Sequence, residues 1–140
     1  MAKHEIARRR TEKLCLALPE ATCERCGSHE AFRVRKKVFA YFLDDHHGDG
    51  IVALCARLPL GQHEELIRQD PERFYLPAYI GPRGWVGLRL DRRSVDWREA
   101  DALIRTSYAT AAPASLLKVL DAASHGRRAR SALARERRIT

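Results

Sequence analysis

The sequence contains no uninterrupted apolar run of the roughly 18 residues that a membrane-spanning helix needs. Its first ten residues, MAKHEIARRR, are highly charged, and no apolar run of signal-peptide length follows them. Cysteine is scarce, with four residues among 140, and a chain of this length can bury a core without disulfides. We therefore expect one cytoplasmic domain with reduced thiols and no membrane partner.

Residue sets that support catalysis are also missing. Ser28 and His29 are merely adjacent, and no serine stands in a nucleophile elbow. The segment from Gly81 to Gly84 lacks the Lys-Ser/Thr pair and the following helix of a phosphate-binding loop. No two carboxylates are placed so that their pKa values would separate. We therefore predict no enzymatic activity, no catalytic residue and no cofactor.

Two segments contain residue types that bind metals. Cys23 and Cys26 have the CxxC spacing of a zinc knuckle or a redox pair, but no second pair accompanies them. The segment from Asp44 to Gly50 combines carboxylates and imidazoles, yet in a calcium-loop register its twelfth position would be Ala56, inside an apolar strand. The favoured interpretation is a strand with its turn for the first segment and a solvated loop for the second. We predict no metal site.

The net charge of +8 is unevenly distributed. Residues 125–140 contain six arginines and one acid, so more than half of the net charge lies in this short segment. It has too few apolar residues to pack, and we predict that it is mobile or only transiently helical. We therefore divide the chain into a folded domain over residues 1–124 and a basic C-terminal tail over 125–140.

Hydrophobic periodicity predicts mixed helices and strands. Val86, Leu88 and Leu90 alternate with other residues as in a half-buried strand, and Asp96 with Glu99 forms a capping-box pattern at the start of a helix. The run over 51–56 is apolar on both faces, which is typical of a central strand. In chain order we predict a helix over 3–18, strands over 22–25, 31–35, 38–43 and 51–56, a helix over 61–69, a strand over 84–90 and a helix from Trp97.

The hairpin formed by the second and third of these strands is the best candidate for a binding surface. Arg33 and Arg35 share one strand face, and Lys36-Lys37 form the predicted turn. Phe39 and Tyr41 follow on the next strand, so cations for phosphate contact lie beside rings that could stack on bases. The alternative is a solvated hairpin whose aromatic rings face the core.

Several spaced motifs over roughly residues 10–120 resemble the MmcQ/YjbR-like family. The matching residues are Leu16-Ala-Leu-Pro19, Phe32-Arg-Val-Arg35, Lys37-Val-Phe39-Ala40, Asp70-Pro-Glu-Arg-Phe74, Pro77-Ala-Tyr79, Gly84-Trp-Val86, Leu90-Asp91, Asp96-Trp97, Ser107-Tyr108 and Ala112-Pro113. The resemblance implies an α+β fold, a single compact domain with an antiparallel sheet flanked by helices. The implied order is α-β(3)-α-β(2)-α, similar to the frataxin-like and secretion-chaperone-like folds.

The same resemblance implies a DNA-binding protein with a double-wing motif and without established catalytic residues. The glycine usual at the hairpin turn of this family is here Lys36, which reduces the conformational freedom of the turn and adds charge. We expect a monomer that contacts DNA phosphates through Arg33, Arg35, Lys36, Lys37 and the tail residues Arg127, Arg128 and Arg130. The alternative hypothesis is a protein-interaction or chaperone-like module with a groove near Tyr79 and Trp85, although the family match favours packing roles for these two aromatics.

Overall fold

The computed structural model describes residues 2–45, 48–92 and 94–122. Its elements, in chain order, are α1 (Ala2–Leu16), β1 (Thr22–Cys26), β2 (His29–Val34), β3 (Lys37–Asp44), β4 (Val52–Arg57), α2 (Gln62–Gln69), β5 (Phe74–Tyr75), the 3-10 helix η1 (Gly81–Arg83), β6 (Trp85–Arg89) and α3 (Trp97–Ala111). Residues 114–122 are helical as well. None of the helices in these ranges has an apolar stretch of the length that a bilayer crossing requires.

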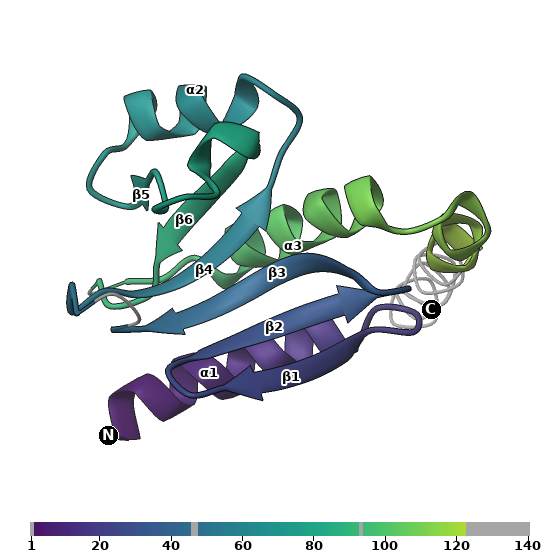
Figure 1. The fold of residues 1–140 in the computed structure, drawn as a ribbon, viewed down its shortest axis with the longest axis horizontal. Helices are drawn as coiled ribbons and strands as arrows, with labels where there is room; N and C mark the ends of the chain where they lie inside the picture. Colours follow the sequence, from purple (N-terminus) through teal and green to yellow (C-terminus); the bar gives the residue numbers. More distant parts are fainter. Residues whose placement is uncertain (1, 46–47, 93, 123–140) are drawn as a thin grey trace, which may run out of the picture.

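The six strands form one antiparallel sheet in the order β1-β2-β3-β4-β6-β5. Helices α1 and α3 pack against one face of this sheet, and α2 lies beside the β5–β6 edge (Figure 1). The predicted α+β class and the single antiparallel sheet flanked by helices are therefore confirmed.

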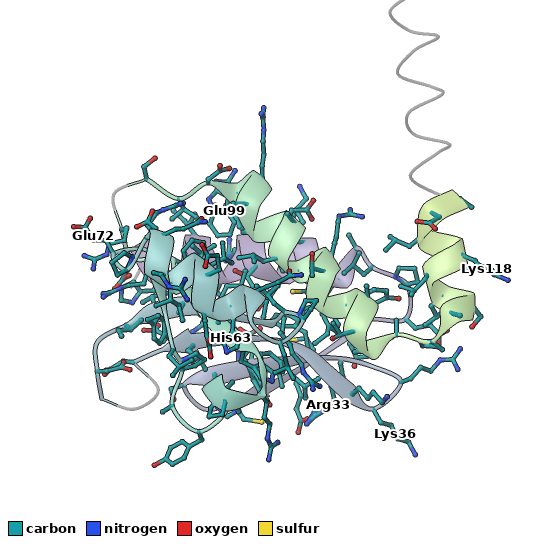
Figure 2. The ribbon with its side chains drawn as sticks, turned by 90° about the horizontal axis from the view of Figure 1, so that it is seen from above. Arg33, Lys36, His63, Glu72, Glu99 and Lys118 are labelled. Atoms are coloured by element: carbon teal, nitrogen blue, oxygen red, sulfur yellow. The ribbon has the colours of Figure 1, made fainter. Side chains whose placement is uncertain are left out.

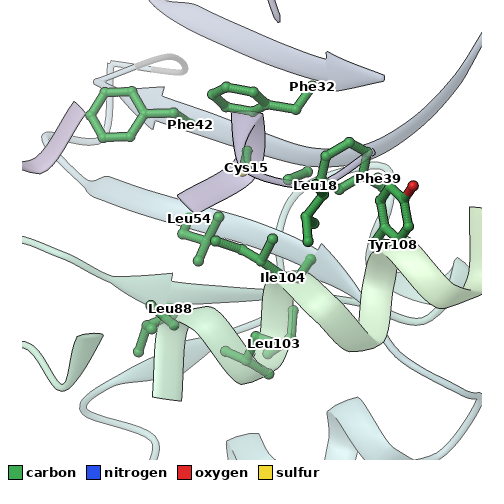
Figure 3. Packing of buried hydrophobic residues seen from close by; sticks show 14 of the residues in the cluster. Cys15, Leu18, Phe32, Phe39, Phe42, Leu54, Leu88, Leu103, Ile104 and Tyr108 are labelled. Carbon is green, nitrogen blue, oxygen red and sulfur yellow. The ribbon is translucent and has the colours of Figure 1, made fainter. Parts of the chain in front are cut away.

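The core lies between the sheet and the helices α1 and α3. Leu54 of β4 projects toward Ile104 of α3, Phe39 of β3 lies beside Tyr108, and Phe32 and Phe42 lie on the side of α1 (Figure 3). Hydrogen bonds fix the position of α3 in addition to this apolar packing. The Ser107 hydroxyl donates to the carbonyl of Phe39 at 2.5 Å, and the Tyr108 hydroxyl donates to the carbonyl of Pro19 at 2.7 Å.

Local sequence signals explain much of this architecture. The Asp96 carboxylate accepts hydrogen bonds from the backbone amides of Arg98 and Glu99, as an N-cap does. The apolar strand β4 is central, as predicted. Glu99, however, does not complete a capping box: its carboxylate binds the Arg73 guanidinium at 2.5 Å, because folding brings the segment before β5 beside the first turn of α3.

The implied order α-β(3)-α-β(2)-α has one strand too few in its first group, because four strands precede α2. The fourth strand agrees with the strand predicted from the residues over 22–25; it is the edge strand β1, which is exposed at all five positions. The alternation of buried and exposed residues that marks a half-buried strand is therefore absent from β1. Its place in the sheet comes from pairing with β2, from Thr22↔Arg33 to Cys26↔His29.

Candidate functional site

The basic hairpin joins β2 to β3 through a two-residue turn. Its turn residues are Arg35 and Lys36, with φ angles of 48° and 72°, whereas Lys37 already begins β3. The turn thus lies one residue earlier than the predicted Lys36-Lys37. Positive φ at both central positions is the pattern of a type I′ turn, which favours asparagine and glycine. Arg35, Lys36 and Lys37 are all exposed.

The strained turn gives a first testable prediction. Because Lys36 has a left-handed conformation that glycine adopts without a Cβ penalty, Lys36→Gly should raise the free energy of unfolding by about 0.5–1 kcal/mol. Lys37→Gly is the matched control, since it removes the same charge from a strand position and should lower stability by a similar amount. Chemical denaturation of both variants measures the difference. Equal losses in the two variants would contradict the turn geometry.

Both predicted arginines of the hairpin hold carboxylates. Arg33 donates to Glu24 at 2.8 Å, and Arg35 makes two hydrogen bonds of 2.8 Å with Glu20. The hydrogen bond from Arg35 lowers the pKa of Glu20. These pairs are solvent-exposed, so water and salt screen them and a competing anion can replace the carboxylates. Among the described residues, Lys36 and Lys37 have no ion pair.

The two aromatic residues after the turn differ in their availability for base stacking, because Phe39 is buried and Tyr41 is only half-buried. Phe39 is fully buried and packs edge-on against Tyr108, with ring centroids 5.3 Å apart. A register irregularity opposite Phe32 and Arg33 places Phe39 and the following alanine both in the core. Tyr41 lies on the other face of the sheet and packs against Trp85 at 5.2 Å. The alternative of a solvated hairpin with inward-facing aromatics is thus correct for Phe39.

The hairpin turn lies at the same end of the molecule as the C-terminal part of the described chain. Figures 1 and 2 both place the β2–β3 turn, with Lys36, at the end where helical residues 114–122 and Lys118 lie. Leu116, only 6% exposed, anchors these helical residues to the core. The predicted tail contacts Arg127, Arg128 and Arg130 lie outside the described residues.

A pocket of about 410 Å³ lies on the sheet face opposite α1 and α3. The lining is mostly apolar and aromatic, and includes His29, Tyr41, Asp49, Tyr75, Leu76 and Tyr79. Tyr79, which the family match favoured as a packing residue, is 87% exposed at the rim, whereas Trp85 is buried behind Tyr41. The groove of the alternative hypothesis therefore exists near Tyr79, with Trp85 as support.

One register line across the sheet builds the floor of this pocket. Tyr41, Cys55, Gly87 and Tyr75 pair successively on strands β3, β4, β6 and β5. The Tyr75 ring lies over Gly87, where a Cβ would stand 2.3 Å from the ring. A glycine inside a strand pattern often marks such a close approach. Gly87 is the sequence signal that could have revealed Tyr75, which sequence analysis did not identify.

Cys23 and Cys26 have the CxxC spacing, but the extended strand does not bring their side chains to one face. Cys23 and Cys26 lie three residues apart on the extended strand β1, so their side chains project from opposite faces. Burial raises the pKa of Cys23 and of Cys55 to about 12, and it also raises the pKa of Cys15. Thiols with raised pKa values are poor nucleophiles at neutral pH. Within the described ranges, no three His, Cys, Asp or Glu side chains are grouped as metal ligands.

Part of the second metal-like segment has a structural role. Asp44 lies 3.4 Å from the His4 imidazole and 4.0 Å from the Arg8 guanidinium, and the Asp45 carboxylate accepts from the backbone amide of Gly50 at 2.6 Å. His46 and His47 lie outside the described residues. The described acids of this segment thus stabilise the β3–β4 loop.

Comparison with known proteins identifies a family and a fold. A model of the YjbR family matches residues 16–110. The chain is similar to the crystal structure of the Deinococcus radiodurans protein DR2400, described with a DUF419 domain, at 21% identity and a TM-score of 0.57, over 69% of this chain and 72% of that one. At this identity the likeness concerns the fold alone. No curated protein matches the chain.

Proposed function

Because this chain belongs to the YjbR family, which is not a known enzyme family, we propose that it is a non-catalytic DNA-binding protein that contacts the phosphate backbone through its basic hairpin and tail. The observation that carries the proposal is the location of the uncompensated Lys36 and Lys37 at the end of the molecule from which residue 122 leads into the arginine-rich tail. Cations gathered at one end can follow one duplex surface.

The two hairpin arginines bind DNA by exchanging their carboxylate partners for phosphates. Arg33 and Arg35 are held in place by Glu24 and Glu20, and a phosphate can replace an exposed carboxylate at little cost. Phosphate contacts of this kind carry no sequence information, which comes from contacts with base edges. We therefore propose backbone binding without base stacking by Phe39, and a weak preference among sequences.

Salt-dependent binding to duplex DNA tests this function. Lys36→Gln/Lys37→Gln should lower the slope of log K against log salt by about 2, because each phosphate contact contributes about 0.9. The control Arg9→Gln/Arg68→Gln removes two exposed cations outside the hairpin and should leave the slope nearly unchanged. Glu20→Gln/Glu24→Gln, which releases both arginines, should raise the affinity.

Two further variants separate the hairpin from the tail. Arg33→Glu/Arg35→Glu should weaken binding in the full chain, and truncation to residues 1–124 should weaken it without abolishing it. The proposal fails if truncation removes all binding while the lysine and arginine variants of the hairpin bind as the full chain does. The polycationic tail alone would then account for DNA binding. Equal losses in the lysine variant and its two-cation control would also contradict it, because net charge alone would then explain the affinity.

The pocket on the sheet face that α1 and α3 leave uncovered favours a second function, a protein-interaction module. Its mouth has two large exposed side chains, Leu76 and Tyr79, and the described part of its lining contains no lysine or arginine. A DNA phosphate would therefore find no partner there. A partner at this pocket would leave the basic hairpin accessible, so the two functions are compatible.

A further inference from the structure

The pocket on the open sheet face has the composition of a site for an organic cation. Tyr41, Tyr75, Tyr79 and His29 contribute four rings to its lining. Aromatic rings have a negative face, and rings around a small cavity attract ammonium and guanidinium groups. A volume of about 410 Å³ accommodates one long side chain, and falls in the range of small-ligand sites.

Asp49 gives this lining a net negative charge. Among the lining residues that the structure describes it is the only acid, and these residues include no lysine or arginine. Within the described chain it makes no ion pair, and one carboxylate oxygen accepts a hydrogen bond from the backbone amide of Ile51 at 3.0 Å. Arg89, the last residue of β6, lies near Asp49, but its guanidinium already donates two hydrogen bonds of 2.8 Å and 3.0 Å to the Asp91 carboxylate. Arg89 also feels the charge of Asp49, so two carboxylates share one guanidinium and a negative charge remains beside the pocket for a ligand.

The rim of the pocket is built to keep an aromatic ring outside the fold. The amide of Ile80 donates to the carbonyl of Ala78 at 2.8 Å, and the residue between them, Tyr79, has a φ of 69°. This is the geometry of the classic γ-turn, which is rare and strained for a bulky residue. The turn directs Tyr79 to the surface beside Leu76, which is also exposed. An apolar rim of this kind extends the contact surface beyond the volume of a small molecule.

Building on the protein-interaction function proposed above, we propose that this pocket binds a lysine or arginine side chain presented by an extended segment of a partner protein. The aliphatic stem of the side chain packs between Tyr41 and Tyr75, the cationic group reaches Asp49, and the peptide backbone lies against Tyr79 and Leu76. Charge complementarity selects the cation, and the exposed rim selects a peptide over a free amine.

Binding of the full-length protein to short peptides tests the proposal. The probes are acetyl-Gly-Lys-Gly-amide, the same peptide with norleucine or glutamate in place of lysine, and free butylammonium. Trp85 fluorescence is the readout, because its ring lies 5.2 Å from Tyr41. We expect the lysine peptide to bind at least about fivefold more tightly than the others, since a desolvated cation–aromatic contact is worth about 1 kcal/mol or more.

Two variants and a matched control locate the binding. Asp49→Asn keeps the acceptor for Ile51 and should weaken the lysine peptide about fivefold, while Asp45→Asn in the same loop, outside the pocket lining, should not. Tyr79→Gly relieves the positive φ and should leave the protein folded while it weakens the peptide by a similar factor. Equal binding of the lysine and norleucine peptides, or equal effects of the two aspartate variants, overturns the proposal. Butylammonium binding as tightly as the peptide would overturn the choice of a protein partner.

Discussion

Replacing Gly84 by alanine should lower the free energy of unfolding by about 3 kcal/mol, or roughly 10 °C in Tm. Gly84 has a φ of 99°, which side chains with a Cβ rarely adopt, and a Cβ there would stand 2.6 Å from the carbonyl oxygen of Leu58. This oxygen belongs to the backbone and cannot rotate away. The carbonyl of Gly84 also accepts from the amide of Leu58 at 2.9 Å, so a shift of Gly84 would break this hydrogen bond.

A second glycine separates the two causes of the Gly84 effect, the positive φ angle and the close backbone contact. Gly27 has a φ of 61°, but a Cβ there would meet nothing within 4 Å. Gly27→Ala should therefore cost only about 1 kcal/mol, which is the conformational part of the penalty. Chemical denaturation of both variants measures the difference. Equal losses would mean that the close approach of Gly84 to Leu58 does not limit the fold.

Replacing Glu30 by alanine should lower the free energy of unfolding by about 3 kcal/mol, because it removes the acid from a buried ionic cluster. Glu30 is only 2% exposed. Its carboxylate binds Arg8 at 3.0 Å and Arg25 at 3.3 Å, and it accepts from the Cys23 thiol at 3.1 Å. With alanine at position 30, the half-buried Arg8 guanidinium would lose this carboxylate partner and lie beside a cavity.

The exposed pair on the same edge of the sheet is the control for Glu30. Glu24 on β1 binds Arg33 at 2.8 Å, but its side chain is largely in water. Glu24→Ala should therefore change stability by no more than about 0.5 kcal/mol. Similar losses for Glu24→Ala and Glu30→Ala would contradict the assignment of Glu30 as the buried centre of the cluster.

The pH dependence of stability gives a second readout of this cluster. Burial and a hydrogen bond with Glu30 raise the pKa of Glu12 above its ordinary value of 4.5. Between that value and the raised one, the folded state holds more protons than the unfolded state, so the contribution of Glu12 to stability falls as the pH rises. Glu12→Gln should remove this fall and slightly stabilise the protein at neutral pH. Urea denaturation from pH 4 to pH 8 measures it.

The residues of the proposed sites divide into those that sequence patterns could indicate and those that they could not. The proposed hairpin cations Arg33, Arg35, Lys36 and Lys37 could be indicated because charge is a local property of the sequence. The ion pairs of the two arginines could not be predicted, because Glu20, for example, lies 15 residues before Arg35 in the sequence. The burial of Phe39 was one of the two alternatives that the sequence allowed, and the register irregularity in the β2–β3 ladder, which no local pattern reveals, decides between them.

The sequence by itself indicated the family through its spaced motifs. It also determined the α+β class and most element positions, because hydrophobic period, N-caps and turn residues act within a few residues of one another. Asp96 and the apolar strand β4 are examples. The tertiary structure alone decided which side chains share a site. The pocket joins His29, Tyr41, Asp49 and Tyr75 from separate segments, and only strand order and register bring them to one face. Register is a non-local property, because each strand is placed by the strands beside it.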